Sequence, residues 1–298
     1  TVRIWDAKNG ICRSELNDGD SITGVMSVGF SPKGNYIASA CDDDTVRLWD
    51  ISTNTCIGLG VHRDAVLDVT YSPEGDTIAS GSADNMVLLW EENGKPKYCL
   101  QGHKDAVSSV VYSPTGKMVV SCSKDKTAML WNVETGKPIH TFGRTNPATS
   151  GHIDPATSGH IDPAISGHTD PATFGHNGPV TSAVFSPDED WVVTSSDDGT
   201  FKLWNIESGE CEATISSSNG KVNCLALRKD NSKVCIVTGG EDGSVRQWHV
   251  SKDGDKRKPI LHWSSSHDVL NVYNASFAGA KDLDPLDIKL LKQREASL

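Results

Sequence analysis

Five sets of side chains in this sequence combine residue types that could perform nucleophilic chemistry. In each set a serine or threonine stands ten residues before a tryptophan, and an aspartate stands six residues before the same tryptophan. The sets are Ser39, Asp43 and Trp49; Ser80, Asp84 and Trp90; Ser121, Asp125 and Trp131; Thr194, Asp198 and Trp204; and Thr238, Asp242 and Trp248. Three sets also have a histidine upstream, namely His62, His103 and His176. A hydroxyl, an imidazole and a carboxylate are the components of a catalytic triad.

The repetition of these sets argues against catalysis. A catalytic triad occurs once in a protein and ends on an exposed nucleophile. Here one arrangement recurs at fixed offsets, each time ending on a tryptophan. We therefore interpret the sets as architecture, and we expect no catalytic residue, no cofactor and no metal ion.

The elements that position these residues are short strands. Trp5 and the five tryptophans of the sets are separated by 44, 41, 41, 73 and 44 residues, and each ends an alternating segment such as Val-Arg-Leu-Trp. Such alternation is typical of a half-buried strand. Upstream, an aromatic-Ser-Pro sequence recurs at Phe30, Tyr71, Tyr112 and Phe185. A repeat of this length predicts an all-β repeat protein.

These segments, with Trp5-Asp6 and Trp49-Asp50, resemble the WD40 repeat family over the chain up to about residue 270. The resemblance implies a β-propeller, and it implies that the histidine, hydroxyl, aspartate and tryptophan of each set form a hydrogen-bond relay. A buried indole N–H needs an acceptor and a buried aspartate needs donors. The histidine is missing where the chain reads Asp18–Ser21 and Ser217–Gly220, so we expect those two blades to be less rigid.

The separation of 73 residues reflects a duplicated octapeptide. Residues 143–182 read GRTNPATS, GHIDPATS, GHIDPAIS, GHTDPATF and GHNGPVTS, the last of which opens the next repeat. Removing four copies of eight residues restores the normal spacing of 41. We expect residues 143–174 to be an exposed loop inserted in the propeller, with no additional blade.

The strand sets predict about six blades. Five are complete, and the sixth is expected to be shared between the two ends of the chain. Its outer strands would be Val2–Asp6 and Ile11–Leu16, and Asn271–Phe277 would begin it, while Pro259–Ser264 would close the blade of Trp248. The alternative is an open fragment of a seven-bladed or double propeller. We assign residues 1–280 to the propeller and 281–298 to a tail whose apolar spacing predicts a short capping helix.

The tail and residues 275–280 also resemble the C-terminal ends of fungal and bacterial repeat proteins, some of which carry a NACHT nucleotide-binding module. The resemblance implies that the chain is part of a longer protein, as the sensor end of a fungal NACHT–WD40 receptor. The sequence opens on Thr1 within a repeat motif, which agrees with this expectation.

The composition restricts the partners. The net charge of -11 disfavours nucleic acids and anionic membranes. The eight cysteines show no CxxC pair and no zinc-like spacing. They are therefore expected to be small buried residues in a reducing compartment, which favours a cytoplasmic location.

The family resemblance also implies a partner-binding face. It would carry the residue before each relay aspartate, namely Asp42, Ala83, Lys124, Asp197 and Glu241. Loops entering the first strands would add Arg63, Lys104, Asn177 and Lys221. Because the first group holds three acidic residues and one cation, we expect an acidic mouth that binds a basic peptide or protein. The expected function is therefore a protein-interaction scaffold and not an enzyme.

Two alternatives to a scaffold with a specific partner stay open. The octapeptides contain His152, His160, His168 and His176, with Asp154, Asp162 and Asp170, and these residue types bind divalent metals. A flexible eight-residue spacing, however, fixes no coordination geometry. A metal-dependent binder, or an enzyme using the propeller channel, is thus one alternative, and a stable repeat scaffold with no single ligand is the other.

Overall fold

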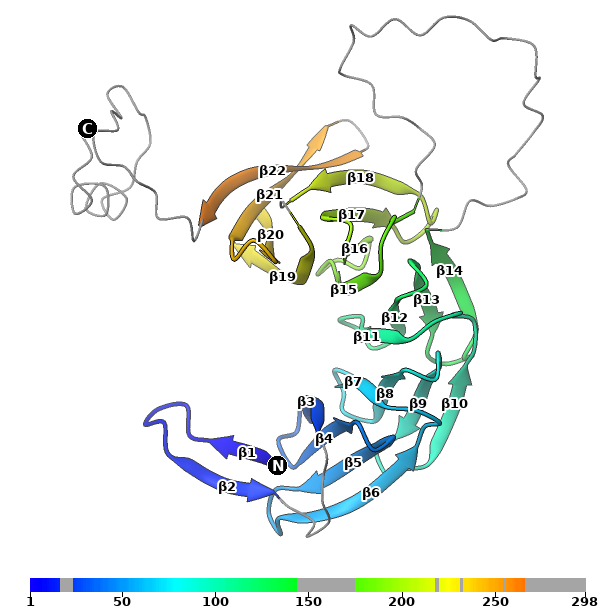
Figure 1. The fold of residues 1–298 in the computed structure, drawn as a ribbon, viewed down its shortest axis with the longest axis vertical. Coiled ribbons are helices and arrows are strands. Elements are labelled where there is room, and N and C mark those ends of the chain that lie inside the picture. The colour runs from blue at the N-terminus through cyan, green and yellow to red at the C-terminus, as the bar shows by residue number, and fades with distance from the viewer. Residues whose placement is uncertain (17–23, 144–174, 218–219, 231–232, 254–255, 266–298) are drawn as a thin grey trace, which may run out of the picture.

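The computed structural model describes residues 1–16, 24–143, 175–217, 220–230, 233–253 and 256–265. These residues form 22 β-strands and no helix. The strands make five four-stranded antiparallel sheets and one two-stranded sheet, which confirms the all-β class and the propeller blades. In Figure 1 the blades follow one another along an arc, with the first strand of each blade toward its inside.

Each blade consists of four consecutive strands. The first comprises β3 (Val25–Phe30), β4 (Tyr36–Cys41), β5 (Thr45–Asp50) and β6 (Thr55–Val61). The second comprises β7 (Val66–Tyr71), β8 (Thr77–Ser82), β9 (Val87–Glu91) and β10 (Pro96–Leu100). The third comprises β11 (Val107–Tyr112), β12 (Met118–Ser123), β13 (Ala128–Asn132) and β14 (Pro138–Phe142). The fourth comprises β15 (Val180–Phe185), β16 (Trp191–Ser196), β17 (Thr200–Asn205) and β18 (Cys211–Ser216). The fifth comprises β19 (Val222–Asp230), β20 (Lys233–Gly240), β21 (Val245–Asp253) and β22 (Lys256–Ser265).

The hydrophobic core lies between successive blades. Trp131 of the third blade shares a buried cluster with Leu89 and Leu100 of the second. Phe142 at the end of the third blade stacks on Trp204 of the fourth, with 5.2 Å between the ring centroids. The tryptophan that ends each repeat motif therefore buries its ring against the preceding blade, and burial of such a large aromatic side chain stabilises the contact between blades.

The N-terminal hairpin takes the place of such a preceding blade. It consists of β1 (Val2–Trp5) and β2 (Cys12–Leu16), and it places Val2 and Leu16 in one buried cluster with Trp49. The two expected outer strands of a sixth blade are thus present as a hairpin. The expected Pro259–Ser264 strand lies within β22 and closes the fifth blade. The expected strand at 271–277 and the C-terminal helix lie outside the described residues.

The two ends of the arc expose surfaces that are buried elsewhere. Val28 and Phe30 of β3 are 52% and 60% exposed, whereas their counterparts on β7, Val69 and Tyr71, are 3% and 7% exposed. At the other end Val245 is 43% exposed, and its counterparts in the other four blades are buried. The outer half of the first blade is covered by the hairpin, but its inner half is not. Figure 1 shows the resulting opening between the hairpin and the fifth blade.

The octapeptide insertion begins and ends at one point of the fold. A Cβ atom on Gly175 would lie 2.4 Å from the carbonyl oxygen of Gly143, so the two backbones touch where the described chain stops and resumes. The strands on either side, β14 and β15, belong to adjacent complete blades. The blade spacing is therefore unchanged by the insertion, although residues 144–174 themselves lie outside the described residues.

None of the eight cysteines, all of which lie within the described residues, forms a disulfide. Cys41, Cys122 and Cys235 are buried, as expected. Cys12, Cys99 and Cys224 are exposed, and Cys56 and Cys211 are partly exposed, which corrects the expectation for these five residues. The three exposed cysteines lie on edge strands, namely β2, β10 and β19. In the part of the chain that the structure covers, no helix has the length and apolar character needed to cross a bilayer.

Candidate functional site

The second blade shows how one set of polar residues is arranged. Nε2 of His62 lies 2.8 Å from the hydroxyl of Ser80, and Nδ1 lies 2.9 Å from Oδ2 of Asp84. The indole N–H of Trp90 donates to the same hydroxyl at 2.9 Å. The imidazole also meets the edge of the Trp90 ring. The four residues are thus joined in one hydrogen-bonded chain.

The third and fourth blades repeat this geometry. The imidazole–hydroxyl distances are 2.7 Å for His103 and Ser121 and 2.8 Å for His176 and Thr194. The imidazole–carboxylate distances are 3.1 Å to Asp125 and 3.3 Å to Asp198. The indole–hydroxyl distances are 2.8 Å from Trp131 and 2.8 Å from Trp204.

The charges in these relays are set by burial and hydrogen bonding. Burial lowers the pKa of His62 and His176 despite the neighbouring carboxylates, which favours a neutral ring. A neutral ring donates from Nδ1 to the aspartate and accepts at Nε2 from the hydroxyl, which in turn accepts from the indole. Burial raises the pKa of Asp84, but hydrogen bonds from the Arg63 backbone and His62 outweigh it and hold the pKa below its usual value.

The relay hydroxyls cannot serve as nucleophiles. Ser80, Ser121 and Thr194 are fully buried, and each is already bonded to an indole and an imidazole. A substrate would have no access to them. The triad-like composition therefore has a structural cause, namely the need of a buried indole N–H for an acceptor.

In the first and fifth blades an arginine supplies the charged partner of the aspartate. Nη2 of Arg47 lies 2.8 Å from Oδ2 of Asp43, and Nη2 of Arg246 lies 2.8 Å from Oδ2 of Asp242. The tryptophans still donate to their hydroxyls, at 2.9 Å for Trp49 and Ser39 and 3.2 Å for Trp248 and Thr238. In the fifth blade Ser217 bonds Thr238 at 2.9 Å, whereas in the second, third and fourth blades a histidine bonds the corresponding hydroxyl.

Sequence reasoning missed these arginines, although a signal was present. Both stand two residues before the tryptophan, in Val-Arg-Leu-Trp and Val-Arg-Gln-Trp. The corresponding residues of the three histidine-containing sets are Leu88, Met129 and Lys202. Among these five blades, arginine occurs at this position only where histidine is absent.

The relay aspartates also fix the loops expected to bind a partner. Oδ2 of Asp84 accepts the backbone N–H of Arg63 at 2.9 Å, and Oδ2 of Asp125 accepts that of Lys104 at 2.8 Å. Likewise, Oδ2 of Asp198 accepts the backbone N–H of Asn177 at 2.8 Å. The residue after each relay aspartate has a positive φ, namely Asp44, Asn85, Lys126, Gly199 and Gly243, so the chain turns sharply there.

The structure brings the two groups of predicted partner-binding residues together on one surface, which we call the relay-aspartate face. Backbone hydrogen bonds link the two loops of each blade, including Lys124 N–H to Ala106 and Glu241 N–H to Lys221. Asp42, Lys124 and Glu241 are exposed, whereas Ala83 and Asp197 are half-buried. The other four, Arg63, Lys104, Asn177 and Lys221, are exposed.

The relay-aspartate face carries cations beside the acidic residues from which the sequence predicts an acidic mouth. Nζ of Lys221 lies 3.1 Å from Oδ2 of Asp197, and its backbone N–H donates to Glu241 at 3.2 Å. Lys221 thus contacts two of the three predicted acidic groups, one through its ammonium and one through its backbone N–H. The prediction of an acidic mouth counted only the residues that precede the relay aspartates, and cations from the neighbouring loops lie on the same surface.

No group of three or more His, Cys, Asp or Glu side chains that could hold a metal ion is present among the described residues. His152, His160 and His168 of the octapeptides, with Asp154, Asp162 and Asp170, lie outside them. His176 belongs to the relay of the fourth blade.

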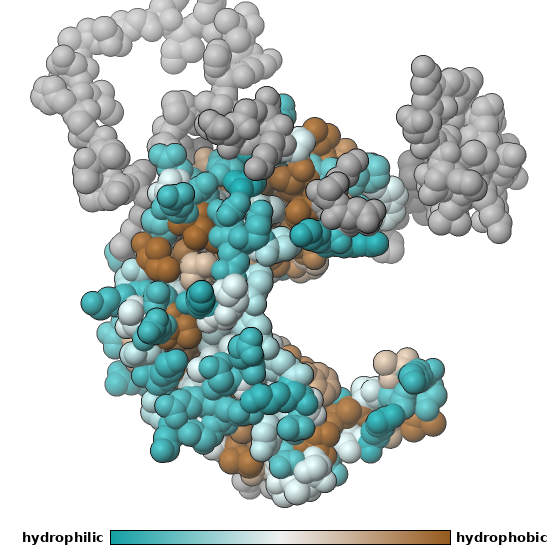
Figure 2. Space-filling view, turned by 180° about the vertical axis from the view of Figure 1, so that it is seen from behind, coloured by the Kyte–Doolittle hydropathy of each residue, from teal (hydrophilic) through white to brown (hydrophobic). Residues whose placement is uncertain are grey.

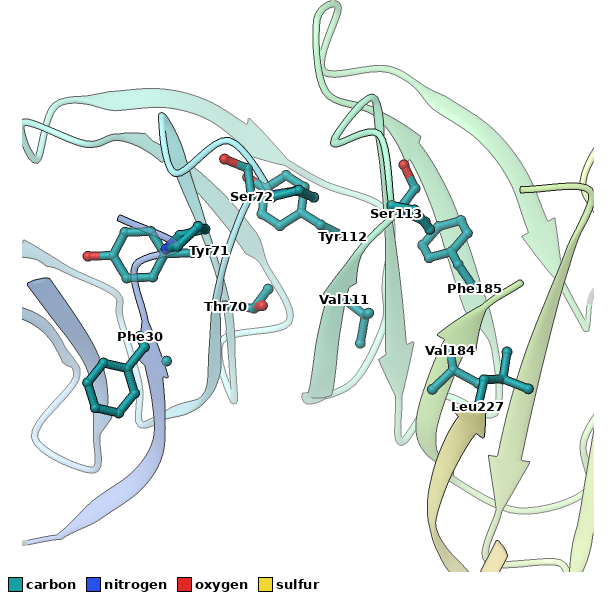
Figure 3. A pocket seen from close by; sticks show the side chains of 14 residues that line it. Phe30, Thr70, Tyr71, Ser72, Val111, Tyr112, Ser113, Val184, Phe185 and Leu227 are labelled. Atoms are coloured by element: carbon teal, nitrogen blue, oxygen red, sulfur yellow. The ribbon is translucent and has the colours of Figure 1, made fainter. Parts of the chain in front are cut away.

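A hollow that the sequence analysis missed lies on the inner side of the arc. It has a volume of about 540 Å³ and is lined by side chains from the inner strands of all five blades, including Phe30, Tyr71, Tyr112, Phe185 and Leu227. Figure 3 shows these rings at the aromatic-Ser-Pro ends of the strands. The signal was the recurrent aromatic-Ser-Pro sequence, whose aromatic residue was interpreted only as the end of a strand. In Figure 2, hydrophilic residues cover much of the molecule and hydrophobic ones form separate patches.

Four-stranded blades on an arc, each tied by an indole–hydroxyl bond, define a protein of the β-propeller class. The chain belongs to the WD40 family. The family model described as "WD domain, G-beta repeat" matches residues 12–50, 54–91, 94–132, 166–205 and 209–249, which together make up more than half of the chain.

Similar proteins match over short stretches. The DENN domain and WD repeat-containing protein SCD1 of Arabidopsis thaliana is 31% identical over 32% of this chain and 8% of its own length. DDB1- and CUL4-associated factor 13 of Xenopus tropicalis is 34% identical over 23% of this chain and 16% of its own length. Nuclear distribution protein nudF 2 of Aspergillus clavatus is 40% identical over 17% of this chain and 11% of its own length. The matched stretches thus span from 8% to 16% of these relatives.

Proposed function

We propose that this chain is a protein-interaction scaffold that binds a partner protein through the relay-aspartate face. The observation that carries the proposal is the hydrogen bond from the backbone N–H of Arg63, Lys104 and Asn177 to a relay aspartate in three successive blades. These bonds hold exposed side chains on fixed loops, and a preorganised surface loses less conformational entropy when it binds. A surface assembled from several blades offers area and polar contacts without a deep pocket.

The distribution of charge suggests which partner would fit. Asp42 presents a carboxylate at the first blade, while Arg63, Lys104 and Lys124 present cations at the second and third. We propose a partner that is basic where it meets the first blade and acidic where it meets the next two. Complementary charges of this kind set orientation and specificity more than affinity.

Affinity capture with charge reversals tests this proposal. The combined Asp42→Lys and Lys124→Glu variant should lose a partner that the unmodified protein captures from its source cell. Lys117→Glu is the matched control, since Lys117 is an exposed cation of an aromatic-Ser-Pro turn. Equal capture by all three proteins would show that the relay-aspartate face is not the binding surface.

The resemblance of the tail supports a narrower proposal, that the chain is the cytoplasmic sensor end of a NACHT–WD40 receptor. This proposal requires a nucleotide-binding module in the same protein. Sequencing the full-length transcript tests it, and a transcript that encodes no such module would contradict it.

A further inference from the structure

A second hollow lies between the first and second blades and faces away from the relay aspartates. It has a volume of about 720 Å³, and its lining includes Tyr36 and Ile57 of the first blade and Asp76, Glu91 and Glu92 of the second. Tyr36 and Asp76 follow the aromatic-Ser-Pro turns of their blades. We call this the Tyr36–Glu92 hollow.

The hollow is acidic. Three carboxylates line it, and the single cation in the lining is Lys33, whose Nζ lies 3.3 Å from Oε2 of Glu92. The hydroxyl of Ser72 donates to Asp76 at 2.6 Å and lowers the pKa of that carboxyl. Lys33 is half exposed and Glu92 is 31% exposed, so this ion pair is accessible to a competing cation. The hollow thus has a surplus of negative charge.

A buried hydroxyl without a partner lies close to two residues of the hollow. Tyr71 is 7% exposed, and its hydroxyl has no hydrogen-bond partner among the described residues. The hydroxyl of Tyr112 in the next blade bonds Thr77, the first residue of β8. The first residue of β4, in the corresponding place, is Tyr36.

The orientation of Tyr71 agrees with this comparison. In Figure 3 its ring extends toward the first blade and away from Tyr112. Burial raises the pKa of Tyr71, and the nearby Glu92 and Tyr36 raise it further. Both neighbours line the hollow. The unsatisfied hydroxyl, itself buried, therefore lies close to two residues that line the hollow.

We propose that the Tyr36–Glu92 hollow binds the guanidinium group of an arginine in a partner peptide. A guanidinium carries five donors in a planar fork and pairs well with several carboxylates at once. Its aliphatic stem would cover Ile57, which is 45% exposed, and the Tyr71 hydroxyl would accept from a donor that reaches it. The ammonium of Lys33 is an internal competitor that the guanidinium displaces. This site is separate from the relay-aspartate face and goes beyond the function proposed there.

An NMR titration with a small probe tests the proposal on the whole chain. The probe is acetyl-Ala-Arg-Ala-amide, the control peptide is acetyl-Ala-Gln-Ala-amide, and the reporter is the side-chain methyl resonances of Ile57. The arginine peptide should shift the Ile57 signals in a saturable way, and the glutamine peptide should not. Identical titrations by the two peptides, or no shift with either, would overturn the proposal.

Variants locate the binding to the hollow. The combined Glu91→Gln and Glu92→Gln change should weaken the arginine peptide about tenfold, because it removes two charge-assisted acceptors. Lys33→Met should strengthen binding about threefold by removing the competitor, and Tyr71→Phe should weaken it about threefold. The matched control is Glu207→Gln with Glu210→Gln, which removes two exposed carboxylates from the turn after Trp204.

The outcomes separate this proposal from the proposed function. If the Glu91→Gln and Glu92→Gln variant binds the arginine peptide as tightly as the control variant does, the Tyr36–Glu92 hollow is not the site. The Asp42→Lys and Lys124→Glu variant should bind the arginine peptide as tightly as the unmodified protein does. If that variant loses the peptide, binding occurs at the relay-aspartate face and the present proposal fails while the proposed function stands.

Discussion

The guanidinium of Arg47 lies 2.8 Å from Oδ2 of Asp43, the relay aspartate of the first blade. In the second, third and fourth blades a histidine binds the corresponding aspartate. The Arg47 side chain is 12% exposed. Burial raises the pKa of Asp43, but hydrogen bonds from Thr45 and Arg47 outweigh it, and the pKa lies below its usual value. The relay aspartate of each blade is therefore held either by the guanidinium of an arginine or by the imidazole of a histidine.

The pairing predicts that Arg47→Met destabilises the protein. The change leaves the half-buried Asp43 without its charged donor, and we expect the free energy of unfolding to fall by about 1–2 kcal/mol. Urea denaturation measures the loss. Arg3→Met is the control, because Arg3 and Glu15 form an exposed pair whose loss should cost less than about 0.5 kcal/mol. Equal losses in the two variants would show that the arginine contributes no more than a surface pair.

The histidine relays predict a loss of stability on mild acidification. Because burial lowers the pKa of His62 and His176, the unfolded chain binds protons first as the pH falls below about 6.5. Above about pH 6.5, His62 and His176 therefore do not make the free energy of unfolding depend on pH. Below it, stability falls by up to about 1.4 kcal/mol per pH unit for each histidine. The lowered pKa of Asp84 adds a further loss only below about pH 4.

Denaturation at pH 7.5, 6.5 and 5.5 measures this dependence. A variant with His62→Asn and His176→Asn should show a flatter profile between pH 6.5 and 5.5, whatever its absolute stability. His140→Asn, on the outer strand β14, is the control. A double variant with the slope of the unmodified protein would show that other groups govern the acid response.

Much of the fold could be predicted from the sequence because the blade is a local unit. The spacing of Trp49 and Trp90 fixes the repeat, and alternation within each strand fixes which face is buried. The expected strand at 259–264 lies within β22 for this reason. Each such feature depends on residues within one repeat.

The parts that the sequence did not reveal depend on contacts between repeats. The ion pair of Lys221 with Asp197 joins the fifth blade to the fourth. A charge count that considers one position in each blade does not detect such a pair. The inner hollow likewise gathers one aromatic or aliphatic side chain from each blade. Arg47 was missed for a different reason, since its role appears only when the histidine-free blades are compared with the others.

Two tyrosines at corresponding positions should respond differently to loss of the hydroxyl. The Tyr112 hydroxyl bonds Thr77 at 3.1 Å, whereas that of Tyr71 has no partner among the described residues. Tyr112→Phe should therefore cost about 1 kcal/mol, and Tyr71→Phe should be neutral or stabilising by up to about 1 kcal/mol. Thermal or urea unfolding of the matched pair checks this. A larger loss for Tyr71→Phe would indicate that its hydroxyl is bonded in solution.

Arg257 joins the fifth blade to the fourth. Its guanidinium lies 2.9 Å from Glu212 and 3.2 Å from Asp190, and it covers the ring of Trp191. Arg257→Met should cost about 3 kcal/mol, because it leaves the nearly buried Glu212 without its cation. Glu212→Gln with Arg257→Met should restore part of this loss, since no uncompensated charge remains. Urea denaturation measures the stability of both variants. A double variant that is less stable than Arg257→Met alone would contradict the pairing of Arg257 with Glu212.

The open end of the arc predicts different costs for two equivalent valines. Val69 is 3% exposed and packs against the first blade, whereas Val28 is 52% exposed at the same position one blade earlier. Truncation of a buried valine removes apolar contacts and leaves a cavity, while truncation of an exposed one does neither. Val69→Ala should therefore cost about 2 kcal/mol and Val28→Ala less than about 0.5 kcal/mol. Equal costs, measured by urea denaturation, would mean that another part of the protein covers Val28, as the sixth blade expected from the sequence would do.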